Sequence, residues 1–159
     1  MNALDFLQQA YMLDQRIQTK MSFISSLRAL AENVRTFTET ERVCRSRNVS
    51  AMEDTIIRII ELEQEVNGEI DRLVDLKKEI LDVIARVRDM NCRLVLEKRH
   101  LCFESWAMIG AEMGHTARWA QIKHRMALEL VQRILDEREG GTGGTVSFVP
   151  PSAENPRLA

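Results

Sequence analysis

The chain has 159 residues, of which 45% are hydrophobic and 29% are charged, and its formal net charge is −2. This composition predicts a soluble, folded chain of one domain, or of a small domain with an extended appendage. It argues against a membrane-spanning protein, because no apolar run approaches the ~20 residues of a membrane helix.

Residues that break helices are scarce. There are three prolines and seven glycines, and four of the glycines lie close together near the C-terminus. Long stretches rich in Leu, Ile, Glu, Arg and Lys therefore predict an all-α fold. The N-terminal sequence has no apolar core, so we expect no signal peptide. The cysteines (Cys44, Cys92 and Cys102) fit neither a disulfide framework nor zinc-ligand spacing, and a reducing cytoplasm is the expected setting.

Residues 2–39 are predicted to form one long helix, because their apolar side chains recur mostly three or four positions apart. Residues 38–51 lose this periodicity and are predicted to be a linker. Arg42, Arg45 and Arg47 gather in the linker. Contact of these arginines with phosphate and simple solvation are both open interpretations.

Residues 52–88 are predicted to form the most regular helix. An apolar residue recurs at every seventh position: Ile59, Val66, Leu73, Ile80 and Val87. Ile56, Ile70 and Ile84 each lie three residues before a member of this row. The pattern resembles the seam of a coiled coil, which Glu63 and Lys77 interrupt. An antiparallel hairpin with helix 2–39 would cover the seam, giving a first unit of residues 1–89. Self-association of two chains, a homodimer through the hairpin region, is the rival arrangement.

Residues 90–137 are predicted to form a helix-turn-helix unit. Ser105 and Thr116 stand where N-cap oxygens would accept from the following amide groups. Gly114 ends the first short helix at a position that favours a left-handed backbone. Gly110 lies inside that helix, which suggests that the second helix approaches it closely. Two short helices joined by a turn that contains glycine are typical of DNA-binding helix-turn-helix proteins.

The second helix of this unit is predicted to turn Trp119, Ile122 and Met126 toward the core. Away from that stripe it carries side chains of the types that bond base edges and phosphates: Arg118, Gln121, Lys123, His124 and Arg125. Residues 91–133 hold seven basic and four acidic residues, a net charge of +3, whereas residues 51–90 have a net charge of −5. A charge of +3 predicts weak, salt-sensitive affinity for DNA by a single copy. Residues 138–159 are rich in Gly, Pro and Ser and are predicted to be a disordered tail.

The stretch ELEQEVNGEIDRLVDLKKEILDVI, residues 61–84, resembles an acidic helix in a family of small phage and prophage proteins of Gram-positive bacteria, some called ArpU-like late-gene regulators. In that family the helix precedes a C-terminal unit similar to region 4 of sigma factors, with the motif LxLRYLxGxSWxEIAxxLGYSxRxVxRLHxxALxxL. The resemblance covers residues 52–135. Eleven residues match the motif without a gap: Leu96, Arg99, Leu101, Ser105, Trp106, Ile109, Gly114, Arg118, His124, Ala127 and Leu128.

The chain departs from this motif in its first turn and in its second helix. The family usually has Gly in the first turn, where this chain has Phe103. The family's apolar Val and Leu in the second helix fall on Ala120 and Lys123. The apolar phase is therefore expected to shift by a residue, to Trp119 and Ile122.

The resemblance implies control of phage-gene transcription through double-stranded promoter DNA, with or without contact to RNA polymerase. The second helix would enter the major groove as a recognition helix. By position, Arg118 and Gln121 would face base edges, followed by Arg125. Both tryptophans are expected in the core. Three further side chains would be placed for phosphate contact: Thr116, Lys123 and His124.

Other functions fit the sequence less well. The histidines have no carboxylate or Cys at a repeating metal-ligand spacing, and no nucleophile elbow or phosphate-binding glycine loop is present. We therefore expect no enzyme, no cofactor and no metal site. Two alternatives stay open. One is a phage packaging or assembly adaptor similar to a small terminase subunit, and the other is a helical interaction protein that does not bind DNA.

Overall fold

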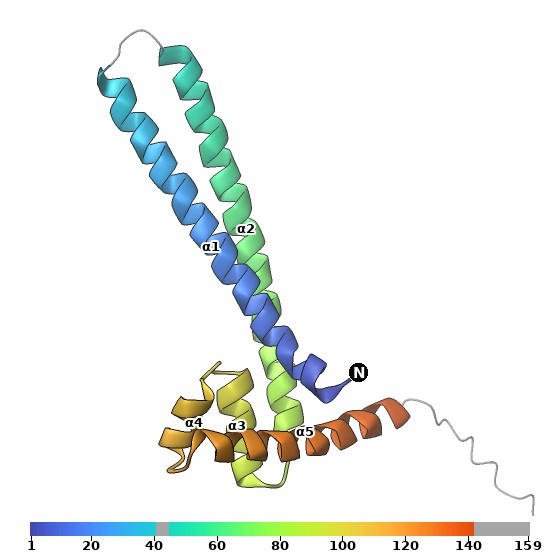
Figure 1. Cartoon of the computed structure of the whole chain (residues 1–159). Coiled ribbons are helices and arrows are strands. Elements are labelled where there is room, and N and C mark those ends of the chain that lie inside the picture. Colours follow the sequence, from blue (N-terminus) through green and yellow to red (C-terminus); the bar gives the residue numbers. More distant parts are fainter. Residues whose placement is uncertain (41–44, 142–159) are drawn as a thin grey trace, which may run out of the picture.

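The structure, a computed structural model, describes the backbone of residues 1–40 and 45–141, and the side chains of residues 1–33 and 49–141. Over these ranges it is all-α, as predicted, and its helices are α1 (Ala3–Thr40), α2 (Arg45–Ile84), α3 (Met90–His100), α4 (Trp106–Glu112) and α5 (Ala117–Gly140). Helices α1 and α2 run alongside each other as a long stalk (Figure 1), which we call the hairpin. Helices α3 to α5, which we call the C-terminal unit, gather where α1 begins and α2 ends.

The predicted boundaries of the second long helix are wrong. Helix α2 begins at Arg45 rather than at Met52, and it ends at Ile84 rather than at residue 88. Most of the predicted linker is helical, because its residues include no glycine or proline and a helix does not need apolar periodicity to continue. Arg42 and the side chains of Arg45 and Arg47 lie outside the described residues. The last helix also extends to Gly140, into the predicted tail, and residues 142–159 lie outside the described part.

The predicted seam is buried at every seventh position. Ile59, Val66, Leu73, Ile80 and Val87 are all buried. Ile84 is buried as well, but Ile56 and Ile70 are 43% and 38% exposed, so α1 does not cover these two positions of the predicted seam. One partner helix covers only a narrow stripe of α2, and residues on the flank of that stripe remain open to solvent.

Ion pairs join α1 to α2 along the hairpin. Glu69, which is buried, accepts hydrogen bonds from Lys20 Nζ at 2.8 Å and from Arg16 Nη2 at 3.0 Å. Lys20 Nζ also lies 3.3 Å from Glu65. The hydrogen bond from Lys20 lowers the pKa of the Glu69 carboxyl. Further along the hairpin, Arg28 pairs with Glu63.

The base of the hairpin and the C-terminal unit share one apolar core. Its buried side chains come from α1, α2, α3 and α5, and include Phe6, Leu7, Ile80, Ile84, Leu96, Val131 and Leu135. At its edge, Gln132 of α5 accepts a hydrogen bond from the Ala3 backbone N–H at 2.7 Å. Because a single core spans both predicted units, the hairpin holds α5 in a fixed position across its base (Figure 1).

Candidate nucleic-acid interface

The turn between α4 and α5 has the local geometry that the sequence predicts. The Ser105 side chain accepts from the Met108 backbone N–H, and the Thr116 side chain accepts from the Trp119 backbone N–H. Gly114 has a φ of +73°, the left-handed conformation that favours glycine. The predicted N-caps and the predicted glycine turn are therefore confirmed.

Gly110 makes the close contact that its place inside a helix suggests. A Cβ atom there would lie 2.6 Å from the carbonyl carbon and oxygen of Thr116 and 2.8 Å from the Ala117 nitrogen. The N-terminus of α5 thus rests directly on the backbone of α4. Glycine at position 110 fixes how closely the two helices approach, and so fixes the angle at which α5 leaves the turn.

A small second core holds α3, α4 and the start of α5 together. Val95, Ile109 and Ala120 are fully buried in it, and three larger side chains pack around them: Trp106, Met113 and Trp119. The ring of Trp119 also stacks on His115 with a centroid distance of 3.9 Å. Both tryptophans therefore serve packing, as expected, and this cluster is what positions α5.

The predicted apolar stripe at the start of α5 is wrong. Ile122 and Met126 are exposed, whereas the side of α5 that faces the core carries Ala120, Ala127, Val131 and Leu135. Small alanines at the first two of these positions let α5 lie close to α3. The apolar phase therefore does not shift, and the second helix keeps its buried side at Ala120, where the resembling family has Val.

The opposite side of α5 is open to solvent, and we call it the outward face of α5. Its residues recur at intervals of three and four positions: Arg118, Gln121, Ile122, Arg125, Met126 and Glu129. Three of the six predicted contact residues, Arg118, Gln121 and Arg125, lie on this face together. Thr116 is exposed at the N-terminal end of the helix, where its oxygen already accepts from Trp119.

His124 does not lie on the outward face, so it is not grouped with the other predicted contact residues. Its Nε2 atom lies 2.8 Å from Nε2 of His100, which is buried, and its ring meets the edge of Trp106. Burial lowers the pKa of His100 to about 3 and that of His124 to about 4. Both rings are therefore neutral near pH 7, with one Nε2 donating to the other. The pair belongs to the packing between α3 and α5.

Many of the basic side chains predicted to give this region its positive charge make contacts within the chain itself. The Arg93 guanidinium donates to Val87 O and Ala85 O, just beyond the C-terminal end of α2. Lys98 pairs with Glu104 and Glu112, and Arg99 lies over the ring of Trp106. Lys123 is half-buried, and its charge adds to the hydrogen bond from the Cys92 backbone N–H that lowers the pKa of the Asp89 carboxyl. The charges that remain on the outward face of α5 are Arg118, Arg125 and Glu129, and Arg133 is exposed one turn further along the helix.

Two features of this site were missed from the sequence. Phe103 has a φ of +57°, so it occupies a left-handed position where the resembling family has Gly. Its ring lies 5.5 Å from that of Tyr11, and Lys77 Nζ lies 4.6 Å above it. The presence of Phe103 in place of the family's Gly was the sequence signal that could have indicated this contact with the hairpin. The second missed feature is the exposure of Ile122 and Met126. Because both residues are apolar, they were predicted to be buried.

No cluster of three or more His, Cys, Asp or Glu side chains suited to a metal ion occurs among the described residues. None of the described helices is long and apolar enough to cross a membrane. Comparisons of the chain with protein-family models, with curated proteins and with solved structures gave no match.

Proposed function

We propose that the chain is a DNA-binding transcription regulator of phage or prophage type, and that α5 enters the major groove with its outward face. The observation that supports this most is the grouping of Arg118, Gln121 and Arg125 on one exposed face of a helix that directly follows a tight turn. Arg bonds guanine and Gln bonds adenine through paired donors and acceptors in the major groove. Base contacts from the first half of such a helix are the usual docking mode.

The N-terminal end of α5 would contact the DNA backbone. The first amide groups of a helix attract phosphate, and Thr116 offers a hydroxyl donor at that end. Only two cations, Arg118 and Arg125, belong to the outward face, so one copy is expected to bind weakly and in a strongly salt-dependent way. A second contact, through RNA polymerase or another copy of the chain, would raise the affinity.

The test is selection of preferred sequences from a random duplex pool at low salt, with and without added bacterial RNA polymerase. The wild type is expected to enrich a short motif, and Arg118→Ala/Gln121→Ala is expected to abolish the enrichment. Arg133→Ala is the matched control, because Arg133 is an exposed arginine of the same helix that lies one turn beyond Glu129 in the C-terminal direction, about 12 Å from Arg125 along the axis. Absence of enrichment in the wild type under both conditions would contradict the proposal.

One observation favours a second candidate function, a helical interaction protein. Ile122 and Met126 are 51% and 48% exposed at the centre of the outward face. Apolar residues at such spacing are how a helix docks into a groove of another protein. DNA binding that survives Ile122→Ala/Met126→Ala but not Arg118→Ala/Gln121→Ala would favour the DNA function. Absence of DNA binding, together with a protein partner that is lost on Ile122→Ala/Met126→Ala, would favour the second.

A further inference from the structure

Helix α2 carries a second row of apolar side chains beside the seam that packs on α1. We call this row the lateral stripe; its apolar members are Val49, Ile56, Ile60, Ile70, Val74 and Leu81. Each of the six side chains is more than a third exposed. Four polar residues complete the stripe: Glu53, Glu63, Asn67 and Lys77. Together the ten positions alternate four and three residues apart, which is the spacing of a coiled-coil seam. Helix α2 therefore has two seams, and α1 covers one of them.

The lateral stripe is symmetrical about residue 65. Positions equally distant from that residue carry matching apolar side chains: Val49 matches Leu81, Ile56 matches Val74, and Ile60 matches Ile70. In a two-fold interface, residue i of one copy contacts residue j of the other, and j contacts i. Two α2 helices crossing antiparallel at residue 65 would therefore place every apolar member of the stripe against an apolar member of the other copy.

The polar positions of the stripe match in the same way. Glu53 would face Lys77, a pair of opposite charge, and Glu63 would face Asn67. Lys77 Nζ donates to the Leu101 carbonyl at 3.0 Å, which holds its side chain in place. In a parallel, in-register pair, Glu53 would instead face Glu53 and Lys77 would face Lys77. The charges of the stripe thus favour the antiparallel orientation.

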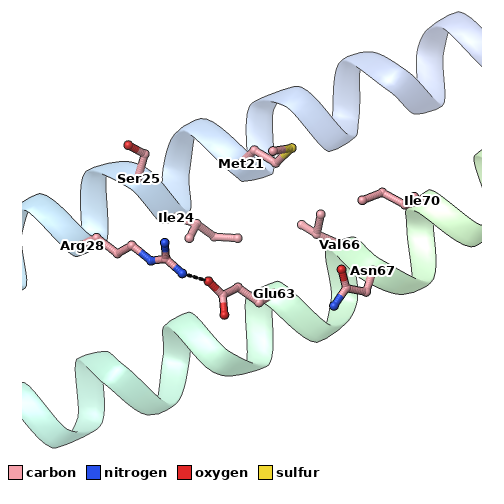
Figure 2. Close-up of a pocket in the computed structure, with 8 residues that line it drawn as sticks. All are labelled: Met21, Ile24, Ser25, Arg28, Glu63, Val66, Asn67 and Ile70. Atoms are coloured by element: carbon pink, nitrogen blue, oxygen red, sulfur yellow. Dashed lines mark hydrogen bonds and ion pairs between the residues drawn. The ribbon is translucent and has the colours of Figure 1, made fainter.

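The hairpin is hollowed beside the stripe. A pocket of about 370 Å³ lies between α1 and α2, lined by Met21, Ile24, Val66 and Ile70, and Arg28 crosses it to reach Glu63 (Figure 2). A second pocket of about 350 Å³ continues from Arg28 and Glu63 past Ile56 and Ile60. Side chains of a second hairpin would fill this groove. The opposite side of the hairpin carries the ion pairs of Glu69 instead.

The size of this face suits a stable dimer. At 1.5 Å per residue, the stripe from Val49 to Leu81 is about 48 Å long, and two packed helices are about 18 Å wide. The face therefore covers about 850 Å², close to the ~800 Å² that each partner buries in a standard interface. We propose that two copies of the chain associate through their lateral stripes, antiparallel about a two-fold axis at residue 65, as a four-helix assembly.

The first test is sedimentation equilibrium of the full chain over a micromolar concentration series. The wild type is expected to be a dimer, and Ile60→Glu should raise the dissociation constant at least tenfold, because each copy would bury an unpaired carboxylate. Leu30→Glu is the matched control. Leu30 is 58% exposed, against 48% for Ile60, and it follows Arg16 and Phe23 at intervals of seven residues, on the side of the ion pairs. It should leave the dimer unchanged, and circular dichroism should show equal helix content in all three proteins.

The second test establishes the orientation. Ile70→Lys alone should also dissociate the dimer, but an equimolar mixture of the Ile60→Glu and Ile70→Lys chains should form a heterodimer. In the antiparallel arrangement the carboxylate introduced at position 60 of one copy would face the ammonium introduced at position 70 of the other. A parallel pair would not bring these charges together. A monomeric wild type, a dimer insensitive to Ile60→Glu, or a mixture that stays monomeric would each overturn the proposal. None of these outcomes depends on DNA binding.

Discussion

The hairpin and the C-terminal unit hold their helices together by different means. In the outer part of the hairpin one apolar row is buried, and the side chains beside it remain exposed. In the C-terminal unit, short helices are fixed by caps, a glycine contact and aromatic packing. Length and regularity thus stabilise the stalk, whereas a few specific residues determine the direction of α5.

Matched core truncations should give the largest difference between the two regions. Ile80→Ala removes a fully buried side chain from the core shared by the hairpin and the C-terminal unit, and should lower the free energy of unfolding by about 4 kcal/mol. Ile59→Ala, in the outer hairpin, should cost only about 2 kcal/mol, because Ile59 packs on one helix beside a groove. Urea denaturation followed by circular dichroism measures both. Equal losses would contradict the difference between the two regions.

The next largest effect is expected at Gly110. Ala at this position would force its Cβ against the Thr116 backbone, so Gly110→Ala should destabilise the chain by about 3 kcal/mol and displace α5. Gly68→Ala is the control in the hairpin, where a Cβ meets nothing within 4 Å. It should stabilise α2 by about 0.5–1 kcal/mol. Thermal unfolding should show a lower melting temperature for Gly110→Ala and a higher one for Gly68→Ala. An unchanged melting temperature for Gly110→Ala would contradict the close contact.

The two regions should also differ in pH dependence. The pKa values of His100 and His124 are lowered to about 3 and about 4, so the unfolded chain binds protons more strongly than the folded one below pH 6.5. The free energy of unfolding should therefore fall by at least about 2 kcal/mol between pH 7 and pH 5. The lowered pKa of Glu69 acts only below about pH 4.5, where its stabilising contribution to the hairpin is lost.

The measurement for this prediction is urea unfolding at several pH values, followed by tryptophan fluorescence. Both tryptophans lie in the C-terminal unit. His100→Phe/His124→Leu should flatten the dependence between pH 7 and pH 5 and leave the change below pH 4.5 in place. A double variant with an unchanged pH profile would show that the pair does not control it.

The smallest effect is expected at Gly114. Its φ of +73° strains any residue with a Cβ, but no atom lies within 4 Å of the added carbon. Gly114→Ala should therefore cost about 1 kcal/mol, from backbone strain alone. Gly114→Asn should cost less, since Asn tolerates the left-handed region better. If Gly114→Ala lowered the free energy of unfolding as much as Gly110→Ala, this would contradict the view that only backbone strain, and no steric clash, acts at position 114.

Local signals in the sequence predicted much of this structure. The seventh-residue repeat predicted the buried row of α2, and the N-caps Ser105 and Thr116 were predicted because capping is local chemistry. The direction of α5 could not be read in the same way. Ile122 and Met126 are apolar, so periodicity assigned them to the core, whereas alanines provide the buried side. His124 is polar, so it was predicted to lie at the surface. Its ring is instead packed between helices, because His100 supplies a hydrogen-bond partner there.

DNA recognition by the outward face of α5 is the central claim. The most direct test is fluorescence anisotropy with an enriched duplex across a salt series, for the wild type, Arg118→Ala, Arg125→Ala and Arg133→Ala. We predict that Arg118→Ala weakens binding about tenfold and that Arg133→Ala matches the wild type. We also predict that Arg125→Ala lowers the slope of log affinity against log salt by about one. Identical affinities and slopes for all four proteins would contradict recognition by this face.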